Sequence, residues 1–162
     1  MPTPRVKFNW SILDRQSIIG FMMSLTPEIV GQHLTIAKFH SKVSNHLKKL
    51  APVRTRKTYN VRSAKNVVWV GGTYYSDWDQ DKKKCIEVVF EYTVLHDTIC
   101  MTAHKFKGVC YTIADTILHE VIHMRQARKR KFKHLPGYSS TAESTKQRQQ
   151  QEYLGDNDEI DA

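Results

Sequence analysis

The sequence has few of the features that mark secreted and membrane proteins. Its three cysteines form no C-x-x-C pair, which argues against a disulfide framework and against a cysteine-based zinc site. No apolar run approaches the ~20 residues needed to cross a bilayer, and the amino terminus lacks the apolar core of a secretory signal. We therefore expect free thiols, no membrane contact and a cytoplasmic location.

Acidic residues are scarce relative to basic ones. The chain has 25 Lys and Arg against 16 Asp and Glu, which gives a formal net charge of +9. Basic residues concentrate in Lys48 to Lys65 and in Arg125 to Lys133, whereas carboxylates gather in Glu152 to Asp161. Such a balance is found in proteins that contact nucleic acid, and equally in proteins with a solvated basic face. The two basic stretches are thus candidate nucleic-acid contacts without a recognised binding motif.

The length of 162 residues suits one domain with a single core. Apolar residues recur at helical spacing in Ser11 to Met23 and in Pro27 to Leu50, which predicts a helical layer within residues 1–50. Pro52 to Lys65 shows no clear period and is predicted to be a connector.

A sheet is predicted within residues 66–102. Asn66 to Tyr75 and Lys84 to Val94 are rich in β-branched and aromatic residues on either side of a polar loop, which predicts an antiparallel hairpin, and Thr98 to Thr102 is a third short candidate strand. Gly71 and Gly72 indicate a bulge or a close backbone approach, or only an ordinary irregularity of the sheet. Helices beside a small antiparallel sheet, followed by another helix, predict an α+β fold.

The most specific motif is the HExxH sequence from His119 to His123. Residues i and i+4 lie on the same side of a helix, so both imidazoles can reach one metal ion. A Zn²⁺ ion held by histidine nitrogens lowers the pKa of its bound water to roughly 7, and Glu120 can take the proton as that water attacks a carbonyl. In a chain with eight histidines the pattern arises by chance with a frequency of roughly 2%, which favours a real metal site.

The helix that carries the motif is predicted to be buried. Tyr111 to Met124 is apolar around most of its circumference, and the whole motif helix is assigned to residues 111–130. Buried histidines need partners, and a metal supplies one, although core histidines satisfied by hydrogen bonds are the alternative. Thr112 and Asp115 form a capping-box-like pair at the predicted start. Asp115 is also placed to accept the N–H of His119 that faces away from a metal.

Two stretches of the sequence resemble the zincin superfamily of zinc metallopeptidases, in particular the small single-domain members of bacteria and phages. They are HEVIHMRQ, which begins at His119, and Asp156 to Ala162, which looks like the helix that brings the third ligand in the glutamate-zincin branch. The resemblance implies a Zn²⁺-dependent peptidase of the bacterial or host cytoplasm that acts on a peptide or protein substrate. It makes His119 and His123 metal ligands, Glu120 the general base and Glu159 the third ligand. It also implies a C-terminal helical segment within residues 131–162, and an edge strand that lies above the motif helix and pairs with the substrate.

Other residues compete for the third-ligand role. Glu152 forms an E-x-x-x-D pair with Asp156, as in some glutamate-zincins, and His134 follows the motif helix as a third histidine does in SprT-like proteases, which are associated with DNA. The metzincin pattern is not met, because Lys129 occupies the place of its third histidine. By the same resemblance, Tyr138, Tyr153 or His134 would stabilise the oxyanion. A nucleic-acid-binding module and a non-catalytic zincin-like protein remain as alternatives, and Glu120 favours the enzyme over the latter.

Overall fold

The computed structural model describes residues 8–60, 68–94 and 97–133. The N-terminal part contains a 3-10 helix η1 (Trp10–Ile12), helices α1 (Arg15–Met23) and α2 (Thr26–Ile29), strand β1 (Leu34–Thr35) and helix α3 (Ile36–Leu50). The central part contains strands β2 (Arg54–Asn60), β3 (Val68–Tyr74) and β4 (Ile86–Thr93), with the short helix α4 (Ser76–Gln80) before β4. Strand β5 (Thr98–Ile99) then leads into the long helix α5 (Ala103–Lys129).

The main sheet has the strand order β2-β4-β3, with the most buried strand, β4, at its centre. Strand β3 is antiparallel to β4 in an unbroken register from Val68↔Tyr92 to Tyr74↔Ile86, which confirms the predicted hairpin. Strand β2 is parallel to β4. The sheet is therefore mixed rather than antiparallel, and the prediction of a connector at Pro52 to Lys65 was wrong for Arg54–Asn60.

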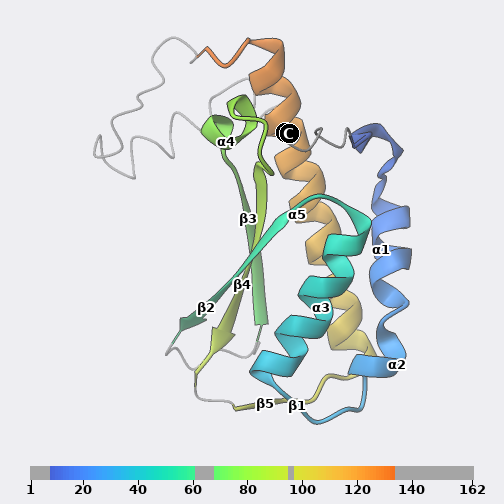
Figure 1. The fold of residues 1–162 in the computed structure, drawn as a ribbon. Helices are drawn as coiled ribbons and strands as arrows, with labels where there is room; N and C mark the ends of the chain where they lie inside the picture. Colours follow the sequence, from blue (N-terminus) through green and yellow to red (C-terminus); the bar gives the residue numbers. More distant parts are fainter. Residues whose placement is uncertain (1–7, 61–67, 95–96, 134–162) are drawn as a thin grey trace, which may run out of the picture.

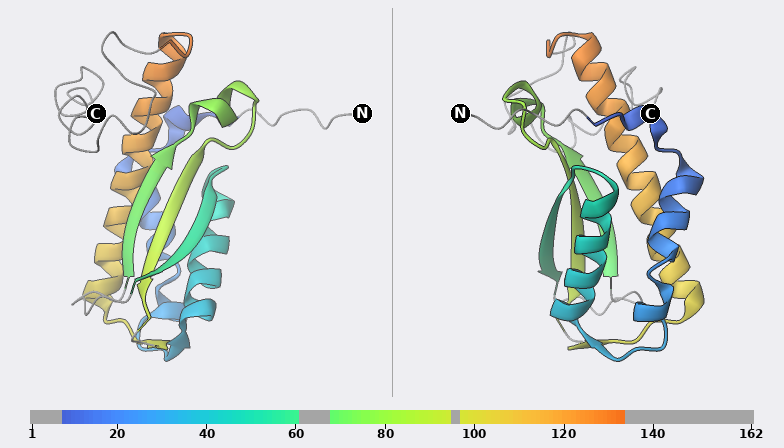
Figure 2. Two further views of the ribbon diagram at one scale, coloured as in Figure 1. Left: turned by 90° about the vertical axis from the view of Figure 1, so that its left-hand side faces the viewer. Right: turned by 45° about the vertical axis from the view of Figure 1, so that its right-hand side comes forward.

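Helices α1, α3 and α5 lie on one side of this sheet, and α4 lies at the end of β3 (Figures 1 and 2). Helix α5 packs on β3 and β4, α3 packs beside it towards β2, and α1 contacts α5 on the side away from the sheet. No helix of the described residues covers the opposite face of the sheet (Figure 2). The architecture is α+β, as predicted, and its core lies between the sheet and the helices.

Two predicted helices have different bounds in the structure. The helix predicted from Pro27 to Leu50 is divided into α2 and α3, because the chain turns at Gly31, where φ is +77°. Strand β1 occupies part of this break and pairs with β5, so that Leu34 lies opposite Ile99. The motif helix begins at Ala103 instead of Tyr111, and its N-cap is Thr102, which accepts a hydrogen bond from the Lys105 backbone N–H.

The helix start at Ala103 also corrects the assignment of the cap. Thr112 and Asp115 lie inside α5, and the Thr112 hydroxyl donates to the Gly108 carbonyl at 2.9 Å. They therefore do not form a capping box. The first turns of α5 escaped the prediction because His104, Lys105, Lys107 and Gly108 interrupt the apolar pattern there.

His40 of α3 gives the core a pH-dependent contact. Its Nδ1 lies 2.8 Å from the hydroxyl of Tyr92, which is fully buried in β4. Burial, followed by the nearby charges of Lys57 and Lys48, lowers the pKa of His40 to about 4.

We expect His40 to reduce stability in mild acid. Because the pKa of His40 in the folded protein is below its unfolded value of about 6.5, the unfolded state binds more protons between these two values. Stability should therefore fall as the pH drops from 6.5 towards 4, by about 1–2 kcal/mol for a half-exposed ring. Urea denaturation across this range should show a shallower pH dependence for His40→Gln than for the wild type. The exposed His33 provides the control, since His33→Gln should keep the wild-type slope; equal slopes for all three proteins would contradict the expectation.

Candidate active site

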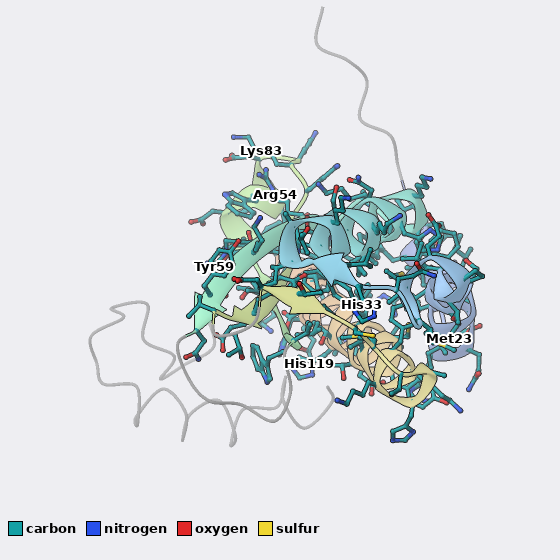
Figure 3. All side chains as sticks on the ribbon, turned by 90° about the horizontal axis from the view of Figure 1, so that it is seen from below. Met23, His33, Arg54, Tyr59, Lys83 and His119 are labelled. Atoms are coloured by element: carbon teal, nitrogen blue, oxygen red, sulfur yellow. The ribbon has the colours of Figure 1, made fainter. Side chains whose placement is uncertain are left out.

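The HExxH motif lies in the C-terminal half of α5, on the part of the helix that packs against the sheet. Glu120 is buried, with 8% of its surface exposed, whereas His119 and His123 are half-buried. In Figure 3, His119 lies on the side of α5 next to the sheet, away from Met23 of α1. The apolar residues of α5 thus hold the motif in place and leave both imidazoles partly accessible.

The two imidazoles face each other through their Nε2 atoms. These atoms are 3.0 Å apart, and the rings are nearly perpendicular, at 82°, with their centroids 4.6 Å apart. Two nitrogens that bind the same tetrahedral zinc ion, each at about 2.0–2.1 Å, lie about 3.3 Å from each other. The observed separation of the two Nε2 atoms therefore needs little change to hold such an ion. The distance also fits a hydrogen bond between the rings. The geometry therefore suits one shared cation or one shared proton.

A complete metal site needs a residue from elsewhere in the chain. Within residues 8–60, 68–94 and 97–133, no three His, Cys, Asp or Glu side chains come together in a way that could hold a metal ion. The predicted third ligands Glu159, His134 and Glu152 lie outside the described residues, as do Tyr138 and Tyr153. These assignments stay predictions.

Asp115 forms an ion pair with helix α1. Its carboxylate accepts a hydrogen bond from Arg15 Nε of α1 at 2.8 Å, and both side chains are largely exposed. This ion pair joins α5 to α1, away from the sheet. The predicted contact between Asp115 and His119 stays a prediction.

Gly72 allows β3 to lie directly on the motif helix. A Cβ atom at this position would overlap Thr116 Cγ2 and would lie 3.3 Å from Glu120 Cγ. Because the register of β3 and β4 is unbroken, the two glycines form no bulge. The close approach predicted from Gly71 and Gly72 is confirmed at Gly72. The same contact fixes the stem of Glu120 between helix and strand.

We expect Gly72→Ala to destabilise the protein by about 1–3 kcal/mol, because the added methyl overpacks the contact between β3 and α5. Thr116→Ala should change stability little by itself and should recover most of the loss in the double variant, since it removes the overlapping atom. Urea denaturation of the four proteins measures this coupling. Gly71→Ala is the control: its Cβ would meet only the Trp69 indole, at 2.6 Å, which is exposed and free to turn. Additive effects at positions 72 and 116 would contradict the expectation.

Strand β3 also provides the edge strand beside the motif. It pairs with β4 on one side; the other side, which pairs with no strand of the described residues, is its free edge. It runs in the same direction as α5, since Val68 and Val70 lie near Val109, whereas Gly72 lies against Glu120. The sequence did not show which strand would be the edge. In the structure, β3, the strand that packs on the motif helix, is an edge strand of the sheet.

An ion pair between the exposed Arg128 and the buried Asp79 holds the end of α5 to α4. Arg128 donates to Asp79 of α4 from Nε at 2.8 Å and from Nη2 at 2.6 Å, and the Tyr74 hydroxyl donates to the same carboxylate at 2.8 Å. Asp79 is buried, with 4% of its surface exposed. Such a bidentate contact fixes the direction of α5 beyond His123. Sequence reasoning missed it, because Asp79 is one of several acidic residues in a polar loop.

Two further expectations concern the cysteine thiols and the membrane. All three cysteines are free, as predicted; Cys85 and Cys110 are buried and Cys100 is exposed. Among the described residues, no helix combines the length and the apolar character that crossing a membrane requires.

No protein-family model, curated protein or solved structure matches the chain.

Proposed function

We propose that the protein is a zinc-dependent metallopeptidase in which His119 and His123 bind the metal and Glu120 is the general base. One observation carries this proposal: the two Nε2 atoms face each other at 3.0 Å on the helix that holds Glu120. A chance pair of core histidines has no need of a glutamate between them on the same buried segment.

Each residue of the motif has a separate task in this proposal. A bound Zn²⁺ ion supplies Lewis-acid chemistry and lowers the pKa of water to roughly 7. Glu120 accepts the proton of the attacking water and passes it to the leaving amine. Glu120 is buried beside Gly72, which limits the space around its stem. Glu159 is the preferred third ligand, ahead of His134 and Glu152, and Tyr138 or Tyr153 would donate to the oxyanion.

The free edge of β3 would present the substrate. An extended peptide can add to such an edge through main-chain hydrogen bonds, which suit many sequences and place a peptide bond at a fixed position. Because β3 packs on α5 at Thr116 and Glu120, a peptide on its outer edge would pass beside the two imidazoles.

The test is hydrolysis by the purified full chain. We expect the zinc-loaded protein to cleave an unfolded protein substrate, a metal chelator to abolish cleavage, and added Zn²⁺ to restore it. If the zinc-loaded protein cleaves neither an unfolded protein nor a library of extended peptides, the proposal is wrong.

A second candidate function, nucleic-acid binding, is favoured by the open face of the sheet. Trp69 is 60% exposed there. Arg54 and Arg56 extend from β2 on the same face, where Arg54 lies over the Trp78 ring and Arg56 pairs with Glu87. An exposed aromatic ring and basic residues on one face suit a single strand, in which bases stack and phosphates pair with cations. Salt-dependent binding of a single-stranded oligonucleotide that weakens in Trp69→Ala would support this function, and salt-independent binding or none would exclude it.

A further inference from the structure

A second feature on the free edge of β3 is a pocket at the N-terminal half of α5. Its volume is about 390 Å³, within the range of ligand sites. Buried apolar side chains form its floor, from the start of β3, from β5 with the residues after it, and from α5: Val68, Val70, Ile99, Met101 and Val109. Its exposed rim is formed by Trp69, Cys100, His104, Lys105, Gly108 and Thr112. An apolar floor of this kind suits a hydrophobic side chain.

The pocket is in line with the HExxH motif. The lining residues of α5 run from His104 to Thr112, and Gly108 at their centre precedes the midpoint between His119 and His123 by 13 residues, or about 20 Å along a helix. Both places are bordered by β3. A peptide on the free edge of this strand would therefore pass the motif and the pocket in turn.

The direction of the peptide follows from the sheet. Antiparallel pairing with β3 is the more stable arrangement for an added strand. Because β3 runs in the same direction as α5, an antiparallel peptide followed from its N-terminus would pass the motif first and the pocket afterwards. An extended chain advances about 3.4 Å per residue, so 20 Å corresponds to about six residues. Alternate side chains of the added strand would point to the helix side, where the pocket lies.

We infer that this pocket selects an apolar side chain about five to seven residues C-terminal to the cleaved bond. This rests on the proposed peptidase function and names a substrate preference for it. A pocket that discriminates by hydrophobic volume changes kcat/KM by at least about tenfold between Leu and Ala at the selected position.

The first test uses Gly108, which also lines the pocket. No atom lies within 4 Å of a Cβ placed at Gly108, so Gly108→Leu should fill the pocket without moving the core. Gly20→Leu is the matched control, because Gly20 is an exposed glycine of α1 with equally open surroundings. The substrates are peptides that share one cleavage site and carry a single Leu at successive positions in an alanine background.

We expect the wild type and Gly20→Leu to prefer Leu at one position about five to seven residues after the cleaved bond, by at least about tenfold. In Gly108→Leu the ratio of kcat/KM between the Leu and Ala peptides should fall to near one. A preference confined to the N-terminal side of the cleaved bond, or a ratio that Gly108→Leu leaves unchanged, would overturn the inference.

A second readout does not depend on turnover. Cys100 is exposed and lines the pocket, whereas burial raises the pKa of the Cys110 thiol to about 12 and Cys85 is also buried. Iodoacetamide should therefore modify Cys100 first in the folded protein. In Glu120→Gln, the peptide with Leu at the selected position should protect Cys100 and the Ala peptide should not.

The two readouts separate the inference from the proposed function. Protection of Cys100 by the Leu peptide, without hydrolysis in the wild type, would refute the peptidase and support the pocket as a peptide site. Hydrolysis without a positional preference and without protection would support the peptidase and overturn the pocket.

Discussion

Replacing Glu120 by Gln is expected to lower kcat for peptide hydrolysis by about 10²–10⁴-fold and to leave the fold and the zinc content unchanged. The amide has nearly the shape of the carboxylate, so the packing of the Glu120 stem against Gly72 is kept. It has no basic oxygen that can take the proton of the attacking water. Initial rates with a quenched fluorescent peptide, together with zinc analysis and circular dichroism, measure the three quantities.

Glu91→Gln is a suitable control for this variant. Glu91 is a half-buried glutamate of β4 that accepts a hydrogen bond from Asn60 Nδ2 at 2.8 Å, on the face of the sheet opposite the helices. A Gln side chain can accept the same bond, so hydrolysis should be unchanged. Undiminished cleavage by Glu120→Gln, in a preparation free of contaminating protease, would remove Glu120 from the role of base.

The sequence predicted the elements that carry the most apolar side chains. Strands β3 and β4 are rich in β-branched and aromatic residues, and the motif region of α5 is apolar around most of its circumference. Both patterns arise because these elements enclose the core. The close approach at Gly72 was also predictable, since only a residue without a Cβ lets a strand lie so near a helix.

Strand β2 was not predictable from its own residues. It is an edge strand whose side chains are half-buried or exposed, so no apolar alternation marks it. Its conformation is fixed by pairing with β4 from Arg54↔Glu87 to Asn60↔Thr93 and by Arg56 Nε, which donates to the buried Glu87 at 3.1 Å. These are contacts between residues about 30 positions apart, and local pattern does not contain them.

The same limit applies to the candidate site. The spacing of His119 and His123 predicted that the imidazoles would meet, because one helix sets that distance. Three other features depend on how separate elements pack: the edge of β3, the ion pair between Asp79 and Arg128, and the pocket beside Val109. Only the structure shows that these features lie along one line with the motif.

Zinc binding should depend on both histidines. We expect about one Zn²⁺ per chain in the wild type after dialysis. The loss of either His119 or His123 should weaken the affinity for zinc on the order of 100-fold or more, because the loss of a residue that only hydrogen-bonds to a ligand already costs about 10–100-fold. His104→Ala is the control, since His104 is an exposed histidine at the other end of α5. Metal analysis and a zinc-dependent rise in Tm measure the effect. Stoichiometric zinc in a protein that lacks both His119 and His123 would contradict the assignment.

The third ligand decides which kind of zincin the site resembles. Asp156, Asn157 and Asp158 suit an N-cap, so Glu159 would lie in the first turn of a helix and project from a fixed backbone, whereas His134 would come from a loop. If Glu159 is the ligand, Glu159→Ala should weaken zinc affinity as strongly as His119→Ala does, and His134→Ala should leave it nearly unchanged. The reverse result would favour the SprT-like arrangement. Because the chain carries a net charge of +9, that outcome would also make a substrate bound to DNA the first to test.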